Sequence, residues 1–144
     1  MQPAGGRLVV SVPARIECRD QVGAQLVEAC RRQVPGERGE ILGHQLVSVF
    51  NEAFNNAVLH AYAGTPGGMV EVSLDIVPPR LELRIADHGR SFDPRSVPEP
   101  DLDQLPEGGL GLFIMRSFMN EVDYQPGAPN VLRLVKYLDG EARV

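Results

Sequence analysis

Hydrophobic and polar positions along the chain follow two different periods, which predict helices in some segments and strands in others. Residues 16–34 and 38–61 carry apolar side chains three and four positions apart, the spacing of amphipathic helices. A third helix is predicted over residues 110–120. Other segments alternate with period two or are rich in β-branched residues, as strands are. The predicted strands comprise residues 8–12, 69–77, 80–87, 122–124 and 131–138.

Turn signals separate these elements and set their order. Pro35-Gly36 ends the first helix. Pro78-Pro79 joins two alternating segments, which is the pattern of an antiparallel hairpin with one solvent-exposed face. Residues 88–108 contain four prolines and are predicted to form a long loop. This order predicts one α+β domain over residues 1–144, a two-layer α/β sandwich with helices on one face of a mixed, mostly antiparallel sheet.

Composition narrows the class of protein. A chain of 144 residues with 43% hydrophobic residues can bury a core, and its apolar runs are too short to cross a membrane. The net charge of −5 and the lack of tryptophan argue against direct nucleic-acid binding. No signal peptide is recognised, so a cytoplasmic location is expected. Cys18 and Cys30 are the only cysteines and are expected to be core or half-buried thiols, not zinc ligands.

Polar residues gather near the end of the second predicted helix. Glu52, Asn56 and His60 are four apart and would share one face, with Asn55 beside them. The amide oxygen of Asn56 is a hard, neutral ligand suited to Mg²⁺ that also binds phosphates. The carboxylate of Glu52 can accept a proton or orient a water. The alternative for this row alone is an ordinary solvated helix face.

Two glycine-bearing segments follow. Asp87 ends a predicted strand, where its carboxylate can accept a hydrogen bond from an exocyclic amine such as that of adenine, and Gly89 lets the backbone pass close to a flat ring. Gly108-Gly109-Leu110-Gly111 precedes the third helix, where glycines let the backbone approach phosphates and the N–H groups favour an anion. Taken alone, the first segment is also explained by a plain turn and the second by a flexible hinge. The chain contains no P-loop sequence.

Read in order, these three segments resemble the N, G1 and G2 boxes of the histidine-kinase-like (GHKL) ATPase superfamily. Within these segments, the amino-acid sequence most resembles that of the anti-sigma factor serine/threonine kinases of that superfamily. The matching segments are NEAFNNAVLHAY at 51–62, ADHGRSFDP at 86–94 and GGLGLFIM at 108–115, and the pattern continues through residues 120–124. The resemblance covers about residues 7–138, nearly the whole chain.

The resemblance implies a role for each matching residue. Glu52 would be the general base or water-orienting carboxylate, and Asn56 would be the Mg²⁺ ligand. Asp87 would be the adenine-binding carboxylate, with Gly89 shaping that pocket. The residues that would contact the phosphates are Gly109, Leu110 and Gly111.

The same resemblance also concerns the loop after Asp87 and one residue within it, Ser91. Residues at about 90–108 would form a short ATP lid. Ser91 stands where many relatives carry a second glycine of the G1 box, so it is a departure from the family pattern that bears on nucleotide affinity.

The resemblance also implies a function with ATP and Mg²⁺. The expected activity is that of a protein serine/threonine kinase that phosphorylates an anti-sigma factor antagonist and binds a sigma factor or similar regulator. Three alternatives stay open: a nucleotide-sensing partner-switching module without kinase activity, a histidine-kinase-type ATPase module acting in trans, and an α+β domain that binds no nucleotide. Relatives are often dimers, so a homodimer is a further expectation, with no face identified.

Overall fold

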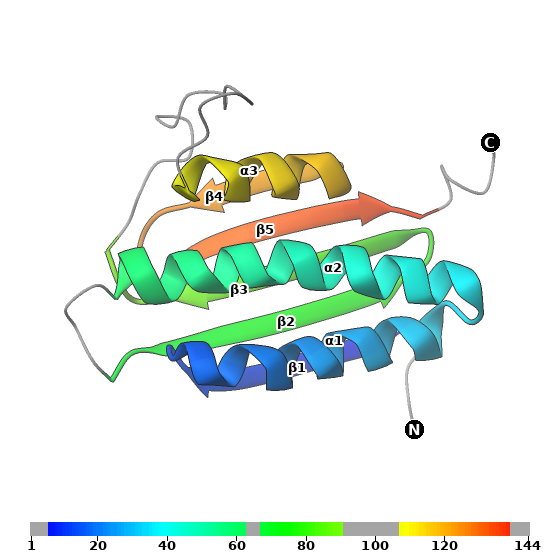
Figure 1. Ribbon diagram of the computed structural model, residues 1–144, viewed down its shortest axis with the longest axis horizontal. Coiled ribbons are helices and arrows are strands. Elements are labelled where there is room, and N and C mark those ends of the chain that lie inside the picture. Colours follow the sequence, from blue (N-terminus) through cyan, green and yellow to red (C-terminus); the bar gives the residue numbers. More distant parts are fainter. Residues whose placement is uncertain (1–5, 63–66, 91–106, 139–144) are drawn as a thin grey trace.

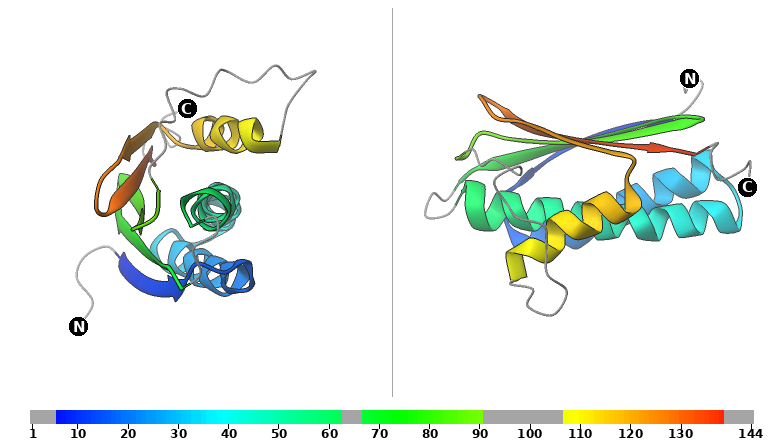
Figure 2. Two further views of the ribbon diagram at one scale, coloured as in Figure 1. Left: turned by 90° about the vertical axis from the view of Figure 1, so that its left-hand side faces the viewer. Right: turned by 90° about the horizontal axis from the view of Figure 1, so that it is seen from above.

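The computed structural model describes residues 6–62, 67–90 and 107–138, and the fold is reported for these segments. Three α-helices cover one face of a five-stranded sheet, while the other face is open (Figures 1 and 2). The helices are α1 (Arg19–Gln33), α2 (Glu37–Asn56) and α3 (Glu107–Phe118). The strands are β1 (Gly6–Pro13), β2 (Met69–Val77), β3 (Arg80–Asp87), β4 (Glu121–Gln125) and β5 (Asn130–Tyr137).

The predicted α+β two-layer architecture is confirmed, and one detail of it is wrong. The strands lie in the order β1-β2-β3-β5-β4, and all four pairings are antiparallel, so the described part of the sheet is not mixed. In the last hairpin, the second strand, β5, pairs with β3, and the first strand, β4, lies at the edge of the sheet (Figure 1). This pairing places the ends of β3 and β5 side by side, with Asp87 opposite Asn130.

The core forms between the sheet and the helices, as the period-two pattern requires. On β3 the inward positions are Leu81, Leu83, Ile85 and Asp87, and all four are buried. Asp87 therefore continues an apolar series, and burying a carboxylate is costly unless it receives hydrogen bonds. The end of β3 is therefore a place in this core where a polar partner is required.

The helices differ from their predicted bounds in ways that matter for the site. The first predicted helix begins as a 3₁₀ turn at Ile16–Cys18 before α1. The second ends its α-helical part at Asn56 and continues as a π-helix over Ala57–Ala61. The third begins earlier than predicted, so the glycine segment at 108–111 lies inside α3 rather than before it.

The two cysteines behave as core residues, as predicted. Cys30 is fully buried in α1, and burial raises the pKa of its thiol to about 11, so it stays protonated and unreactive at neutral pH. Cys18 is half-buried and also free. None of the helices in the described segments combines the length and the apolar character that spanning a membrane requires.

Candidate nucleotide site

Asn56 and Asp87, predicted to serve one site, line the same cavity between α2 and the sheet. Three alanines spaced four apart, Ala53, Ala57 and Ala61, form the helical wall, where larger side chains would fill the space. The remaining lining residues come from the sheet, namely Ile85, Tyr124 and Leu132. Apolar walls with a carboxylate and an amide at the rim are the usual composition of a small-molecule pocket.

This cavity is small in the structure described here. Its volume is about 20 Å³, room for about one water molecule but not for a purine ring. Two roomier clefts of about 370 and 460 Å³ lie elsewhere and contain neither Asn56 nor Asp87. A nucleotide base can occupy the Asn56–Asp87 cavity only if the surrounding side chains move apart.

The carboxylate of Asp87 is held by two hydrogen bonds to the same oxygen. Its Oδ1 accepts from the backbone N–H of Gly89 and from the Nδ2 of Asn130, both at 2.9 Å. Oδ2 receives no hydrogen bond from the residues that the structure describes. Asp87 is 7% exposed, and its orientation is fixed on one side while the other oxygen remains able to accept a donor from a ligand.

Asn130 is a site residue that the sequence analysis missed. It is fully buried, and its Nδ2 also donates to the carbonyl oxygen of Gly89 at 2.9 Å. Its Oδ1 accepts from the backbone N–H of Gly127 at 2.9 Å. One amide thus ties together Asp87, Gly89 and the turn before β5. Its position directly after a Pro/Gly-rich turn was visible in the sequence, but its pairing with Asp87 depends on the β3–β5 register.

We expect Asn130→Ala to destabilise the fold and to weaken nucleotide binding together. The change removes one of the two hydrogen bonds to the buried carboxylate of Asp87 and leaves the partly buried carbonyl oxygen of Gly89 without its Asn130 donor, and such a loss costs about 1–3 kcal/mol. Urea denaturation and calorimetric titration with Mg-ADP measure the two effects. Asn120→Ala is the control, since Asn120 accepts a single exposed hydrogen bond from the Tyr137 N–H. Equal losses of stability in the two variants would contradict the role given to Asn130.

Gly89 is required by a close approach of two backbone segments, and its predicted approach to a flat ring stays a prediction. A Cβ built on Gly89 would lie 2.2 Å from the carbonyl oxygen of Ala61. The next residue, Arg90, donates its backbone N–H to that same oxygen at 2.7 Å. Gly89 therefore packs the segment after β3 against the π-helical end of the second helix, beside the cavity.

We expect Gly89→Ala to lower the free energy of unfolding by about 1–3 kcal/mol, because the added methyl meets backbone atoms that cannot rotate away. Gly23→Ala is the matched control with the opposite expected sign. Gly23 lies inside α1, where an added Cβ would meet nothing closer than 3.8 Å and where alanine favours the helix. Thermal denaturation of both variants measures the difference, and a neutral Gly89→Ala would remove the close-packing account.

Tyr62 is a second residue whose position the sequence analysis did not foresee. Its hydroxyl donates to the carbonyl oxygen of Met69 at 2.8 Å and accepts from the backbone N–H of His88 at 2.6 Å. A Cβ on Gly68 would lie 2.5 Å from the Tyr62 ring, so Gly68 makes room for it. Tyr62 links the end of the helix to both strands and holds the residue after Asp87 in place.

The structure describes the first two side chains of the predicted row of Glu52, Asn56 and His60. Glu52 and Asn56 lie one turn apart in the regular part of α2, and both are half-buried. Beyond Asn56 the helix continues as a π-helix over Ala57–Ala61, and the side chain of His60 lies outside the described part of the structure. Glu52 is not among the residues that line the cavity. Asn55 accepts a hydrogen bond from Arg19 Nη1 at 3.0 Å.

The predicted phosphate-binding residues Gly109, Leu110 and Gly111 lie in the first two turns of α3. The first turn of a helix has N–H groups without helical acceptors, so the start of α3 retains the anion-binding chemistry expected of a loop. Ser91 and residues 91–106 of the predicted lid lie outside the described residues.

The donor groups fit a magnesium ion that arrives with phosphates rather than one held by protein alone. Within the described segments, no cluster of three or more His, Cys, Asp or Glu side chains is placed to bind a metal. Asn56 offers a neutral amide oxygen at the cavity. Mg²⁺ in nucleotide sites commonly takes one or two protein oxygens and completes its shell with phosphates and water.

The chain belongs to the family described as the histidine kinase-like ATPase domain, whose sequence profile matches residues 12–136. The match spans all five strands in part or whole and all three helices. The resemblance of the N, G1 and G2 segments to the histidine-kinase-like superfamily is thereby confirmed.

Individual relatives place the chain near one branch of this family. It is 40% identical over 99 residues to the serine-protein kinase RsbW of Bacillus velezensis and 39% identical over 99 residues to that of Bacillus subtilis. Each alignment covers 63% of this chain and 62% of the relative, so the similarity spans about three fifths of those kinases.

Solved structures support the fold. The RsbU and RsbW domains of Rv1364c from Mycobacterium tuberculosis superpose with a TM-score of 0.63 at 18% identity, covering 92% of this chain and 32% of that one. The blue-light activated histidine kinase EL346 of Erythrobacter litoralis gives 0.59 at 14% identity, covering 84% and 42%.

Proposed function

We propose that this chain is an ATP-dependent protein serine/threonine kinase of the anti-sigma factor type. The observation that carries the proposal is the shared cavity of Asn56 and Asp87 in a chain of the histidine kinase-like ATPase family. The similarity to serine-protein kinases named RsbW supports serine rather than histidine as the acceptor. The proposed partners are an anti-sigma factor antagonist, as the phosphorylated protein, and a sigma factor or similar regulator, as the protein that is bound.

The proposed roles follow from the chemistry of each side chain. Asp87 Oδ2 accepts a hydrogen bond from the exocyclic amine of adenine, while Oδ1 stays bound to Gly89 and Asn130. The backbone N–H groups at the start of α3, around Gly109, face the phosphates. Asn56 contributes its amide oxygen to Mg²⁺, which when bound offsets the negative charge of the phosphates.

In the proposed transfer the acceptor serine hydroxyl gives its proton to Glu52. Its oxygen forms a bond to the γ-phosphorus as the bond between that phosphorus and the β–γ bridging oxygen of ATP breaks, and ADP leaves. Glu52 lies one turn before Asn56 on the same helix and does not line the small cavity. The protein's contribution is positioning and charge, since no protein nucleophile is needed.

The proposal is tested by incubating the chain with radiolabelled ATP, Mg²⁺ and a purified anti-sigma factor antagonist. We expect label on the antagonist that survives acid, as phosphoserine and phosphothreonine do. Label that is lost in acid would instead indicate phosphohistidine and an ATPase module of the histidine-kinase type. Nucleotide binding without any transfer would remove the kinase claim.

One observation favours a second function, nucleotide-dependent partner switching without catalysis. The cavity must widen to admit a base, so nucleotide binding and a local conformational change are coupled in this chain. Under this alternative ATP changes the affinity for the partner, and no phosphate moves. The same assay, run alongside a partner-binding titration with and without Mg-ATP, separates the two functions.

A further inference from the structure

Tyr124 enters the Asn56–Asp87 cavity from an edge of the sheet. It lies on β4, which within the described part of the chain has a neighbouring strand on one side only. Its register partner on β5 is Leu132, which in turn pairs with Ile85 on β3, so the three side chains form one row on the inward face. Two strand spacings, about 10 Å, separate β4 from β3. Tyr124 therefore lines the same small cavity as Asp87 by leaning across Leu132, which its long side chain allows.

The other walls of this cavity have little freedom to move. The three alanines of α2 have no side-chain rotamer that could clear space. Ile85 and Leu132 are 3% and 9% exposed and lie on strands that are paired on both sides. Asp87 is held by its two hydrogen bonds. Among the lining residues that the structure describes, Asn56 and Tyr124 remain, and both are half-buried. Of these two, Tyr124 has much the larger side chain.

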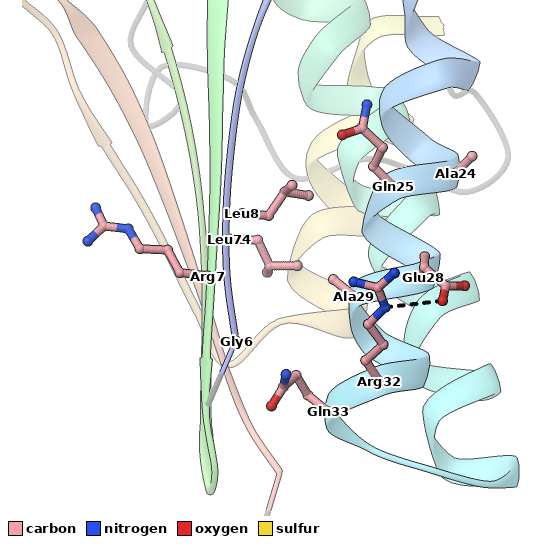
Figure 3. A pocket seen from close by; sticks show the side chains of 10 residues that line it. All are labelled: Gly6, Arg7, Leu8, Ala24, Gln25, Glu28, Ala29, Arg32, Gln33 and Leu74. Atoms are coloured by element: carbon pink, nitrogen blue, oxygen red, sulfur yellow. Dashed lines mark hydrogen bonds and ion pairs between the residues drawn. The ribbon is translucent and has the colours of Figure 1, made fainter. Parts of the chain in front are cut away.

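A turn of the Tyr124 ring toward solvent would leave a space suited to a nucleotide base. A planar ring vacates a flat space, and the walls around it are apolar, with Ala57 on the helix and Ile85 and Leu132 on the sheet. A purine base is also flat and presents π-faces to its surroundings. The roomier groove between β1 and α1 gives no other route to Asp87, because the two share no lining residue (Figure 3).

We propose that Tyr124 is the movable wall of the base pocket. Its ring occupies the place of the purine in the structure described here, and it turns out toward solvent when a nucleotide binds. The inference rests on the proposed nucleotide site and names the residue that controls entry to it. A ligand that binds a minor conformation binds more weakly in proportion to the population of that conformation. Tyr124 therefore lowers the affinity for nucleotide, although it is part of the site.

The test is a calorimetric titration of the full chain with Mg-ADP. Tyr124→Ala removes the ring, so we expect binding to be about tenfold tighter or more, the gain when a binding conformation populated at about 10% or less becomes permanent. The same variant should melt at a lower temperature without nucleotide, because a packed aromatic ring is lost. A role in packing alone predicts weaker binding together with lower stability, so the opposite signs of the two effects distinguish a movable wall.

Two further variants serve as controls. Val122 lies on the same strand and the same face as Tyr124, is likewise half-buried against the core, and does not line the cavity. Val122→Ala should therefore lose stability and still bind Mg-ADP like the wild type. Tyr124→Phe keeps the ring and should also bind Mg-ADP like the wild type.

The tyrosine ring resonances test the same claim in the wild-type chain, so the proposal does not depend on the folding of a variant. We expect nuclear Overhauser contacts between the Tyr124 ring and the Ala57 methyl without nucleotide, because both line the small cavity. These contacts should disappear at saturating Mg-ADP. The ring of Tyr137, which is exposed, is the internal reference and should not respond.

Several results would overturn the proposal while leaving the nucleotide site in place. They are a Tyr124→Ala variant that binds Mg-ADP no more tightly than the wild type, an equal gain in Val122→Ala or Tyr124→Phe, and contacts from Tyr124 to Ala57 that persist at saturation. If neither the wild type nor Tyr124→Ala binds Mg-ADP, the proposed nucleotide site itself is wrong, and this inference with it.

Discussion

Replacing Glu52 by glutamine is expected to slow phosphoryl transfer by about 10²–10⁴-fold, the usual contribution of a positioned general base. Glutamine has the same shape as glutamate, but its amide cannot take the proton of the acceptor hydroxyl. Glu52 is half-buried in α2 and does not line the cavity, so the affinity for Mg-ADP should change little. Single-turnover transfer measurements and calorimetric titration separate the two quantities.

Glu40→Gln provides the control on the same helix. Glu40 lies in the first turns of α2 and pairs with Arg31 at 2.7 Å, far along the helix from Asn56. Its replacement removes a charge without touching the site, so the transfer rate should stay at the wild-type level. A Glu52→Gln variant that transfers phosphate at the wild-type rate would show that Glu52 is not the base.

Replacing Asp87 by asparagine is expected to weaken Mg-ADP binding by about 10- to 150-fold. This corresponds to about 1.5–3 kcal/mol, the contribution of a hydrogen bond to a charged group. The asparagine oxygen can still accept from Gly89 and from Asn130, so the fold should persist. The other position becomes an N–H donor, which opposes the adenine amine and suits a carbonyl instead. Calorimetry should therefore show a loss of preference for ADP over GDP.

The control for Asp87→Asn is Asp75→Asn on the adjacent strand. Asp75 lies on the open face of β2, where it pairs with Arg7 at 3.5 Å and is partly exposed. Its variant should bind Mg-ADP like the wild type. If Asp87→Asn binds ADP and GDP with wild-type affinities, the carboxylate does not contact the base, and the role proposed for it is wrong.

Much of the fold was predictable because the hydrophobic pattern is regular. Alternation over residues 69–77 and 80–87 predicted the central hairpin, and the structure pairs these strands along their length. The inward position of Asp87 follows from the same alternation, since it shares the face of Leu83 and Ile85. The order of β4 and β5 in the sheet was not predictable, because strand order depends on contacts distant in sequence.

The candidate site was predictable only where a residue carries its chemistry in its type and its place in a motif. Asn56 and Asp87 were found in this way. Asn130 was not, because it becomes part of the site through the β3–β5 register. The π-helix at Ala57–Ala61 was also missed, since apolar spacing does not distinguish it from continued α-helix.

The most direct test of the account is a titration of the isotope-labelled chain with Mg-ADP, followed by the side-chain amide resonances of Asn56 and Asn130. The account predicts saturable shifts of both resonances and of the Gly89 backbone amide, because all three groups surround or hold the carboxylate of Asp87. These shifts should be lost in Asp87→Asn at the same nucleotide concentration. Saturable shifts confined to residues away from this cavity, or no shifts at all, would contradict the claim that Asn56 and Asp87 enclose a nucleotide site.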